Sequence, residues 1–180
     1  MTIYVMMAEG FEEIEAVTIV DILRRAELDA KTVSISGNKE VTGAHGVTLH
    51  ADILFDVELL KEGDMVVLPG GMPGTENLEA HPGLTSLLRY YAEEGKWIAA
   101  ICAAPMVLGR MGLLKGKAAT CYPGFEEYLA GAECRTERVV QEGKFITSRG
   151  PGTAMEFSLK LVEVAVGREL ANTIREGTLL

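Results

Sequence analysis

The chain has 180 residues, of which 48% are hydrophobic and 24% charged, values typical of a single globular domain covering residues 1–180. Its 17 basic and 26 acidic residues give a net charge of −9, which argues against a nucleic-acid partner because phosphates need a basic face. Three cysteines without a Cys-x-x-Cys pair argue against a disulfide framework or a zinc site and favour a cytoplasmic protein.

The amino terminus lacks the basic segment of a signal peptide. The longest apolar run, residues 97–109, is shorter than the roughly 20 residues that a membrane-spanning helix needs. We therefore expect neither a secretory signal nor a membrane partner.

Apolar periodicity predicts strands that alternate with helices along the chain. The expected strands are 3–7, 31–36, 47–51, 65–68, 97–101 and 118–120, and a hairpin joins 138–140 to 144–147. The expected helices are 11–26, 82–94, a segment after residue 102, 125–129, 155–166 and 170–175. This alternation is typical of a mainly parallel sheet covered on both faces, in which ligands bind beyond the carboxyl ends of the strands.

Cys102 lies where the apolar strand 97–101 is expected to turn into a helix that has Pro105 in its first turn. A side chain at such a strand-to-helix elbow is presented at the carboxyl end of the strand. Unpaired N–H groups at the helix start favour the thiolate, so the pattern predicts a reactive cysteine. The alternative for Cys102 is a buried structural cysteine. Cys121 and Cys134 do not lie at a helix start, so we interpret them as ordinary thiols.

Glu15 is a carboxylate at the head of an otherwise apolar helix row. Desolvation would raise the pKa of a carboxyl group at that position, and beside Cys102 it could donate a hydrogen bond or move a proton. The alternative is an acid that bends to solvent and complements the helix dipole, the role we expect for Glu12 and Glu13.

Gly70 and Gly71 directly follow the buried strand 65–68, where glycine lets backbone N–H groups approach a ligand closely. Together with the N–H of Ala103 they could form a two-donor oxyanion hole, although most glycine pairs form plain turns. Residues 70–75 lack the lysine of a phosphate-binding loop, so no nucleotide cofactor is expected. The glycine-rich turn 149–153 could bind an anion or simply start the next helix.

Histidine is the usual base beside a cysteine nucleophile, but none lies near Cys102 in the sequence. His45, His50 and His81 are each expected to be surface or loop residues. Spatial proximity stays open, because catalytic groups assemble from distant segments.

Four segments resemble the ThiJ/PfpI superfamily, and most closely its branch that contains the parkinsonism-associated protein deglycase. They are Phe11–Glu15, Leu68–Gly71, Ala100–Pro105 and Thr147–Thr153, within a similarity that runs from about Ile3 to Leu170. The resemblance implies an α/β, flavodoxin-like three-layer sandwich with a mainly parallel sheet, usually a homodimer. We expect no cofactor and no metal.

The resemblance also assigns roles to residues of this sequence. Cys102 would be the reactive cysteine, Glu15 its protonated partner, and Gly71 with Ala103 the oxyanion donors. The pocket around them would comprise Gly70, Tyr122, Arg149, Gly150 and Pro151. Tyr122 departs from the pattern, because the most similar members carry a histidine 20 residues after the cysteine, and a phenol is a poor general base at neutral pH.

Two functions follow from the resemblance. In the first, Cys102 is the nucleophile of a deglycase or glyoxalase that acts on reactive dicarbonyls or their glycated adducts in a stress-protection role. In the second, the protein is a redox sensor or holdase chaperone in which Cys102 is oxidised and no turnover is needed. The missing histidine weakens the expectation of Cys-His hydrolysis and leaves the pairing of Cys102 with Glu15 intact.

Overall fold

The computed structural model describes residues 1–180 and is built on a seven-stranded sheet. Its strands are β1 (Thr2–Met7), β2 (Asp29–Ser34), β5 (Ile53–Leu54), β6 (Met65–Leu68), β7 (Trp97–Ile101), β10 (Val139–Glu142) and β11 (Phe145–Ser148). They lie in the order β10-β11-β7-β6-β1-β2-β5, and every neighbouring pair is parallel except the β10–β11 hairpin. The order reverses between β1 and β6, the position at which sheets of this kind form their sites.

The connections contain the helices and two smaller sheets. The helices are α1 (Glu13–Arg25), α2 (Val57–Lys61), α3 (Gly74–Ala80), α4 (Pro82–Glu93), α5 (Pro105–Arg110), α6 (Ala154–Val166) and α7 (Arg168–Gly177), with 3-10 turns at η1 (Glu126–Tyr128) and η2 (Pro151–Thr153). The small sheets pair β3 (Glu40–Thr42) with β4 (Thr48–His50), and β8 (Ala118–Ala119) with β9 (Glu133–Cys134).

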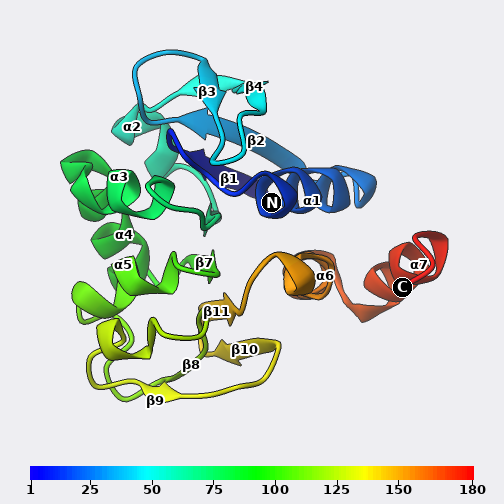
Figure 1. Cartoon of the computed structure of the whole chain (residues 1–180). Coiled ribbons are helices and arrows are strands. Elements are labelled where there is room, and N and C mark those ends of the chain that lie inside the picture. The colour runs from blue at the N-terminus through cyan, green and yellow to red at the C-terminus, as the bar shows by residue number, and fades with distance from the viewer.

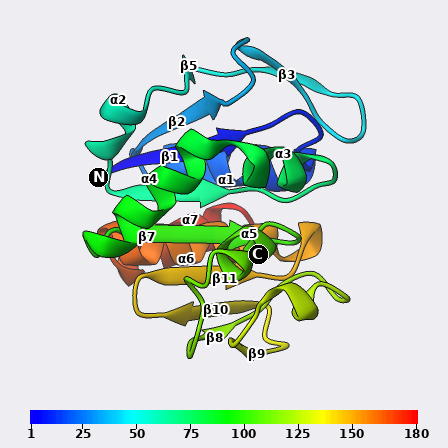
Figure 2. The same cartoon turned by 90° about the vertical axis from the view of Figure 1, so that its left-hand side faces the viewer.

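Helices cover both faces of the sheet, as Figures 1 and 2 show. Helices α1, α6 and α7 lie on one side, and α3, α4 and α5 lie on the other (Figure 1). The side chains of β1 alternate between the two layers: Ile3, Val5 and Met7 join one apolar cluster, whereas Tyr4 and Met6 join the other. The predicted flavodoxin-like α/β sandwich with a mainly parallel sheet is therefore confirmed.

Short elements account for most of the differences from the sequence-based expectation. The strand expected at 118–120 is real but lies outside the main sheet, and the short helix at 125–129 is a 3-10 turn. Helices α2 and α3 and the strands β3, β5 and β9 were not predicted. Helix α1 begins at Glu13 rather than Phe11, because the Glu12 side chain caps it by accepting a hydrogen bond from the N–H of Glu15.

The carboxyl ends of β1, β6, β7 and β11 meet at one edge of the sheet, since these strands are parallel neighbours. The segments that follow them contain the residues singled out in the sequence. None of the helices is both long and apolar enough to cross a membrane.

Candidate active site

Cys102 occupies a strained elbow directly after β7. Its φ of 65° lies in the left-handed region, which is uncommon for a residue other than glycine and often marks functional sites. The surrounding backbone holds this conformation, because the Cys102 N–H donates to the Ser148 carbonyl (3.0 Å) and its carbonyl accepts from the Tyr122 N–H (2.7 Å). The side chain is mostly buried, since the residue is only 8% exposed. The expected elbow is thus present in the structure.

Glu15 lies in the first turn of α1 and is fully buried. Its Oε2 accepts a hydrogen bond from the N–H of Gly70 at 2.7 Å, whereas Oε1 has no hydrogen-bond partner of normal geometry. Burial raises the pKa of Glu15 to about 7, although the hydrogen bonds that its carboxylate accepts from Gly70 and Cys102 lower the pKa in part. A carboxyl group with this pKa can both accept and donate a proton near neutral pH.

Gly70 separates Glu15 from Cys102 and has no room for a side chain. A Cβ at this position would lie 2.6 Å from the Cβ of Cys102 and 2.9 Å from Oε2 of Glu15. Gly71 needs glycine for a second reason, because its φ of 91° is left-handed and a Cβ would collide with the backbone of Glu12. Both glycines therefore permit the close approach of three segments that are distant in the sequence.

The N–H groups of Gly71 and Ala103 both donate to the Cys102 sulfur and lower its pKa. Burial and the negative charge of Glu15 act more strongly, and together they raise the pKa of the Cys102 thiol above its usual value. The prediction that the helix start favours the thiolate is therefore wrong, because burial and the charge of Glu15 outweigh the two backbone donors. Protonation of Glu15 removes the repelling charge, so the titrations of the two groups are coupled.

The remaining predicted pocket residues are Tyr122, Arg149, Gly150 and Pro151. Tyr122 is 45% exposed, and its ring covers Gly150, at which a Cβ would lie 3.1 Å from the ring. Arg149 and Pro151 are half-buried and follow Ser148, whose carbonyl holds the Cys102 backbone. One terminal nitrogen of Arg149, Nη1, is buried without a hydrogen-bond partner.

The sequence suggested a pocket around Cys102, and the two cavities of the structure lie elsewhere. One of about 270 Å³ lies between α1, β2 and the β3–β4 hairpin, and the other is lined by residues that include Glu9, Asn77 and His81.

The other two cysteines have different surroundings. Cys121 is buried in the apolar layer opposite that of Cys102, and burial raises the pKa of its thiol to about 12. Cys134 is exposed, and all three cysteines are free thiols.

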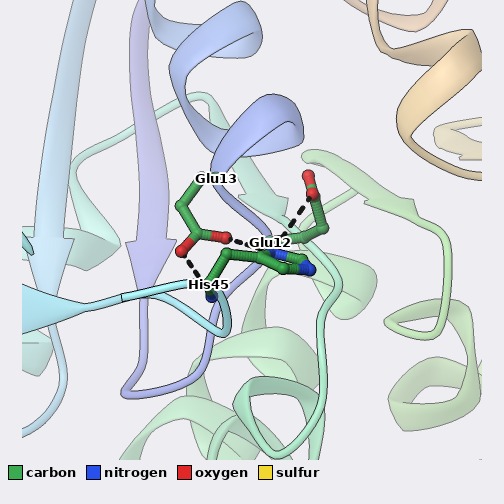
Figure 3. A group of neighbouring side chains, drawn as sticks. All are labelled: Glu12, Glu13 and His45. Atoms are coloured by element: carbon green, nitrogen blue, oxygen red, sulfur yellow. Dashed lines mark hydrogen bonds and ion pairs between the residues drawn. The ribbon is translucent and has the colours of Figure 1, made fainter. Parts of the chain in front are cut away.

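One group beside the site was not recognised in the sequence. Glu12 and Glu13 are buried rather than solvent-facing, and both carboxyl groups face His45 (Figure 3). His45 is exposed, as expected, but it comes next to Glu13 through the β3–β4 hairpin, 32 residues along the chain. Nothing in the local sequence signals this pairing, because it depends on how the hairpin folds over α1.

The structure is thus an α/β sandwich that brings together a cysteine at a strained elbow, a buried carboxyl group and two backbone donors at one edge of its sheet. The model of the DJ-1/PfpI family matches residues 1–164, and the chain belongs to this family. The resemblance to the ThiJ/PfpI superfamily is therefore confirmed.

Similar proteins span plants, animals and a protozoan. The chain is 43% and 42% identical to the Arabidopsis thaliana proteins DJ-1 homolog A and homolog B over 99% and 94% of its length, but it spans only 46% and 39% of theirs. It is 34% identical to the Caenorhabditis elegans glutathione-independent glyoxalase DJR-1.2, over 92% of this chain and 89% of that protein. The structure of oxidised Toxoplasma gondii DJ-1 superposes with a TM-score of 0.93 at 39% identity, covering 99% of this chain and 97% of the other.

Proposed function

We propose that this protein is a cysteine-dependent enzyme of the glyoxalase or deglycase type, which acts on reactive dicarbonyls or their adducts in protection against carbonyl stress. The observation that carries the proposal is the environment of the Cys102 sulfur. Two backbone N–H groups point at it, and a buried carboxyl group with a pKa of about 7 lies beside it. The name of the C. elegans relative, a glutathione-independent glyoxalase, supports this class of reaction.

The proposed reaction of methylglyoxal begins with the proton of the Cys102 thiol, which the Glu15 carboxylate accepts. The sulfur then bonds to the aldehyde carbon and gives a hemithioacetal, whose oxyanion is held by the N–H groups of Gly71 and Ala103. Glu15 gives the thiol proton to this oxyanion and, as a carboxylate again, moves a second proton from the former aldehyde carbon to the neighbouring carbon, which oxidises the first carbon and reduces the second. The product is a lactoyl thioester, and water releases lactate and regenerates the thiol.

A substrate panel tests this proposal. Methylglyoxal, glyoxal and the methylglyoxal adducts of N-acetylcysteine and N-acetylarginine are incubated with the wild type and with Cys102→Ser. We expect consumption of at least one of them and formation of the hydroxy acid, both lost in Cys102→Ser. A comparable rate in both proteins would exclude Cys102 as the nucleophile, and the preferred substrate would separate glyoxalase from deglycase activity.

A redox sensor or holdase is the second candidate. The donors that would hold a hemithioacetal oxyanion would equally hold the oxygens of a Cys102 sulfinate, and the T. gondii relative is described in an oxidised state. Titration with hydrogen peroxide followed by peptide mass spectrometry tests this function. The sensor function would be favoured if a sulfinate forms at Cys102 and the wild type consumes none of the dicarbonyls or adducts of the substrate panel.

We also propose that residues 1–180 act as one domain in the cytoplasm. Two copies of the chain associate through the face formed by α1 and the β3–β4 hairpin. Ile14, Val17 and Val47 are 57%, 47% and 50% exposed on this face, beside the apolar cavity of about 270 Å³. Light scattering coupled to size exclusion should give a dimer mass for the wild type and a monomer mass for Val17→Asp. A monomeric wild type would exclude the assembly.

A further inference from the structure

Ser148 and Thr153 form a chain of buried hydrogen bonds beside the Cys102 elbow. Ser148 is the last residue of β11 and is fully buried, and Thr153, the last residue of η2, is 6% exposed. Their hydroxyl oxygens lie 2.6 Å apart, and the Ser148 oxygen is also 2.6 Å from the carbonyl oxygen of Arg138. Neither hydroxyl group takes part in the reaction proposed for Cys102, so that reaction leaves a buried polar network without a role.

The direction of each hydrogen bond in this chain follows from its end at Arg138. The Arg138 carbonyl can only accept, so the Ser148 hydroxyl donates its single hydrogen to it, and the Thr153 hydroxyl donates to Ser148. The N–H of Gly150 donates to Thr153 Oγ1 at 3.1 Å. The Gly150 carbonyl, 2.9 Å from the same hydroxyl, already accepts from the Thr153 N–H at 2.8 Å. Each hydroxyl group therefore donates once and accepts once.

The chain supports one peptide group, that between Ser148 and Arg149, from both sides. The Ser148 hydroxyl anchors the residue before this peptide, and Thr153 anchors the N–H of Gly150 after it. The carbonyl of this peptide accepts the Cys102 N–H at 3.0 Å. Because β11 ends at Ser148, the residues that follow have no strand partner to orient this carbonyl, and the hydroxyl chain supplies that support.

Cys102 needs such support because its φ of 65° is left-handed. A residue other than glycine keeps this conformation only where the surrounding structure imposes it. The Ser148 carbonyl holds the peptide before Cys102, and the Tyr122 N–H holds the peptide after it, through the Cys102 carbonyl at 2.7 Å. Since a peptide group is planar, this second bond also sets the direction of the Ala103 N–H, one of the two donors to the sulfur. Both hydrogen bonds are thus needed to keep the sulfur beside its donors.

We propose that Ser148 and Thr153 are positioning residues for Cys102. Their hydroxyl chain fixes the Ser148 carbonyl, this carbonyl keeps Cys102 left-handed, and the left-handed conformation holds the sulfur beside the two backbone donors. The inference rests on the function proposed for Cys102, but the reactivity of the thiol tests it without any turnover. The chain lies at the β10–β11 end of the sheet, far from the β3–β4 hairpin (Figure 2), and it is buried whether or not two copies associate.

The rate at which iodoacetamide alkylates Cys102 tests the proposal. Rate constants at pH 8 are measured by peptide mass spectrometry. We expect them to fall by about tenfold in Ser148→Ala and Thr153→Val, because the sulfur loses donors that stabilise the thiolate. Thr153→Ser keeps the hydroxyl and should stay within about threefold of the wild type. The matched control is Ser158→Ala, whose fully buried hydroxyl donates to the Ala154 carbonyl within α6 (2.7 Å) and should leave the rate within about twofold.

The double variant Ser148→Ala/Thr153→Val separates positioning from a general loss of stability. Because the two hydroxyl groups act in one chain, it should react no more than about twofold more slowly than the slower single variant. Ser148→Ala and Ser158→Ala should have similar melting temperatures, although only the first loses reactivity. A rate for Thr153→Val that matches the Ser158→Ala control or exceeds the wild type would overturn the proposal, as would Thr153→Ser as slow as Thr153→Val or fully multiplicative losses in the double variant.

Turnover of methylglyoxal supplies an independent measurement. Thr153→Val should lower kcat by about tenfold or more while KM stays within about threefold, because the chain orients the nucleophile and leaves the rest of the site in place. A loss confined to KM would contradict a positioning role. A wild type without turnover would contradict the proposed function, and the alkylation rates would then decide the role of the hydroxyl chain alone.

Discussion

Glu15 and Cys102 lie on either side of Gly70, and the protonation state of each depends on the other. The charge of the Glu15 carboxylate raises the pKa of the Cys102 thiol, and the hydrogen bond between the two groups lowers the pKa of Glu15 from the still higher value that burial would give. The pair therefore behaves as one acid–base unit. Both kcat/KM and the free energy of unfolding should change with pH as this unit gains or loses a proton.

The pH dependence of kcat/KM should report Glu15. Above about pH 7 the carboxylate can accept the thiol proton, so kcat/KM for methylglyoxal should rise with pH through an apparent pKa of about 7. Glu15→Gln keeps an acceptor for the Gly70 N–H but cannot take a proton. It should lose roughly 10²–10⁴-fold in kcat/KM together with this limb of the profile, measured in buffers that contain EDTA. A Glu15→Gln profile with the wild-type midpoint would assign the limb to another group.

The stability of the protein should fall as pH rises, whereas kcat/KM should increase. The pKa of Glu15 is raised from 4.5 to about 7, so the folded protein binds its proton more tightly than the unfolded chain does. The free energy of unfolding should therefore fall as pH rises from about 4.5 to 7, by roughly 3 kcal/mol from this group. Urea titrations at pH 5 and pH 8 should show this loss in the wild type and not in Glu15→Gln. An equal loss in both proteins would show that Glu15 ionises normally.

Gly70→Ala should disturb the site and the fold together. The added methyl group would meet the Cβ of Cys102 and the Glu15 carboxyl group, so we expect a destabilisation of about 1–3 kcal/mol and loss of most of the activity. Gly152→Ala is the matched control, because a Cβ there meets nothing within 4 Å. If Gly70→Ala were as stable and active as Gly152→Ala, the close approach of the three segments would not be required.

Tyr122 should act as a wall of the site rather than as a base. Its ring covers Gly150, and the hydroxyl group forms no hydrogen bond in the structure. Tyr122→Phe should keep most of the activity on methylglyoxal, and Tyr122→His should change it by less than about tenfold. A gain of about hundredfold in Tyr122→His would instead identify the missing base as the limiting defect and favour the sensor function.

The sequence predicted the sheet and the position of Cys102 because both follow from local patterns. Buried strands such as Met65–Leu68 read as continuous apolar runs, and Glu15 stood out because it interrupts an apolar helix row. Helix α3 was missed because Gly74, Thr75 and Asn77 are poor helix formers, and hydrogen bonds from its first residues to the backbone of Gly10 and Gly71 hold it in place.

Long-range properties were beyond the sequence. The contact of Glu13 with His45 arises only when the β3–β4 hairpin folds against α1. The direction of the Cys102 pKa shift was also mispredicted, because it depends on the depth of burial and on the distance to Glu15 rather than on the helix start alone.

A double-mutant cycle on lactate formation tests most directly whether Cys102 and Glu15 act as one unit. The initial rates of lactate formation from methylglyoxal are measured for the wild type, Cys102→Ser, Glu15→Gln and the double variant, with Cys121→Ser as a control. We predict activity in the wild type and the control, a rate reduced to background in Cys102→Ser, and no further loss in the double variant. Substantial lactate formation by Cys102→Ser, or by Glu15→Gln at the wild-type rate, would contradict the account.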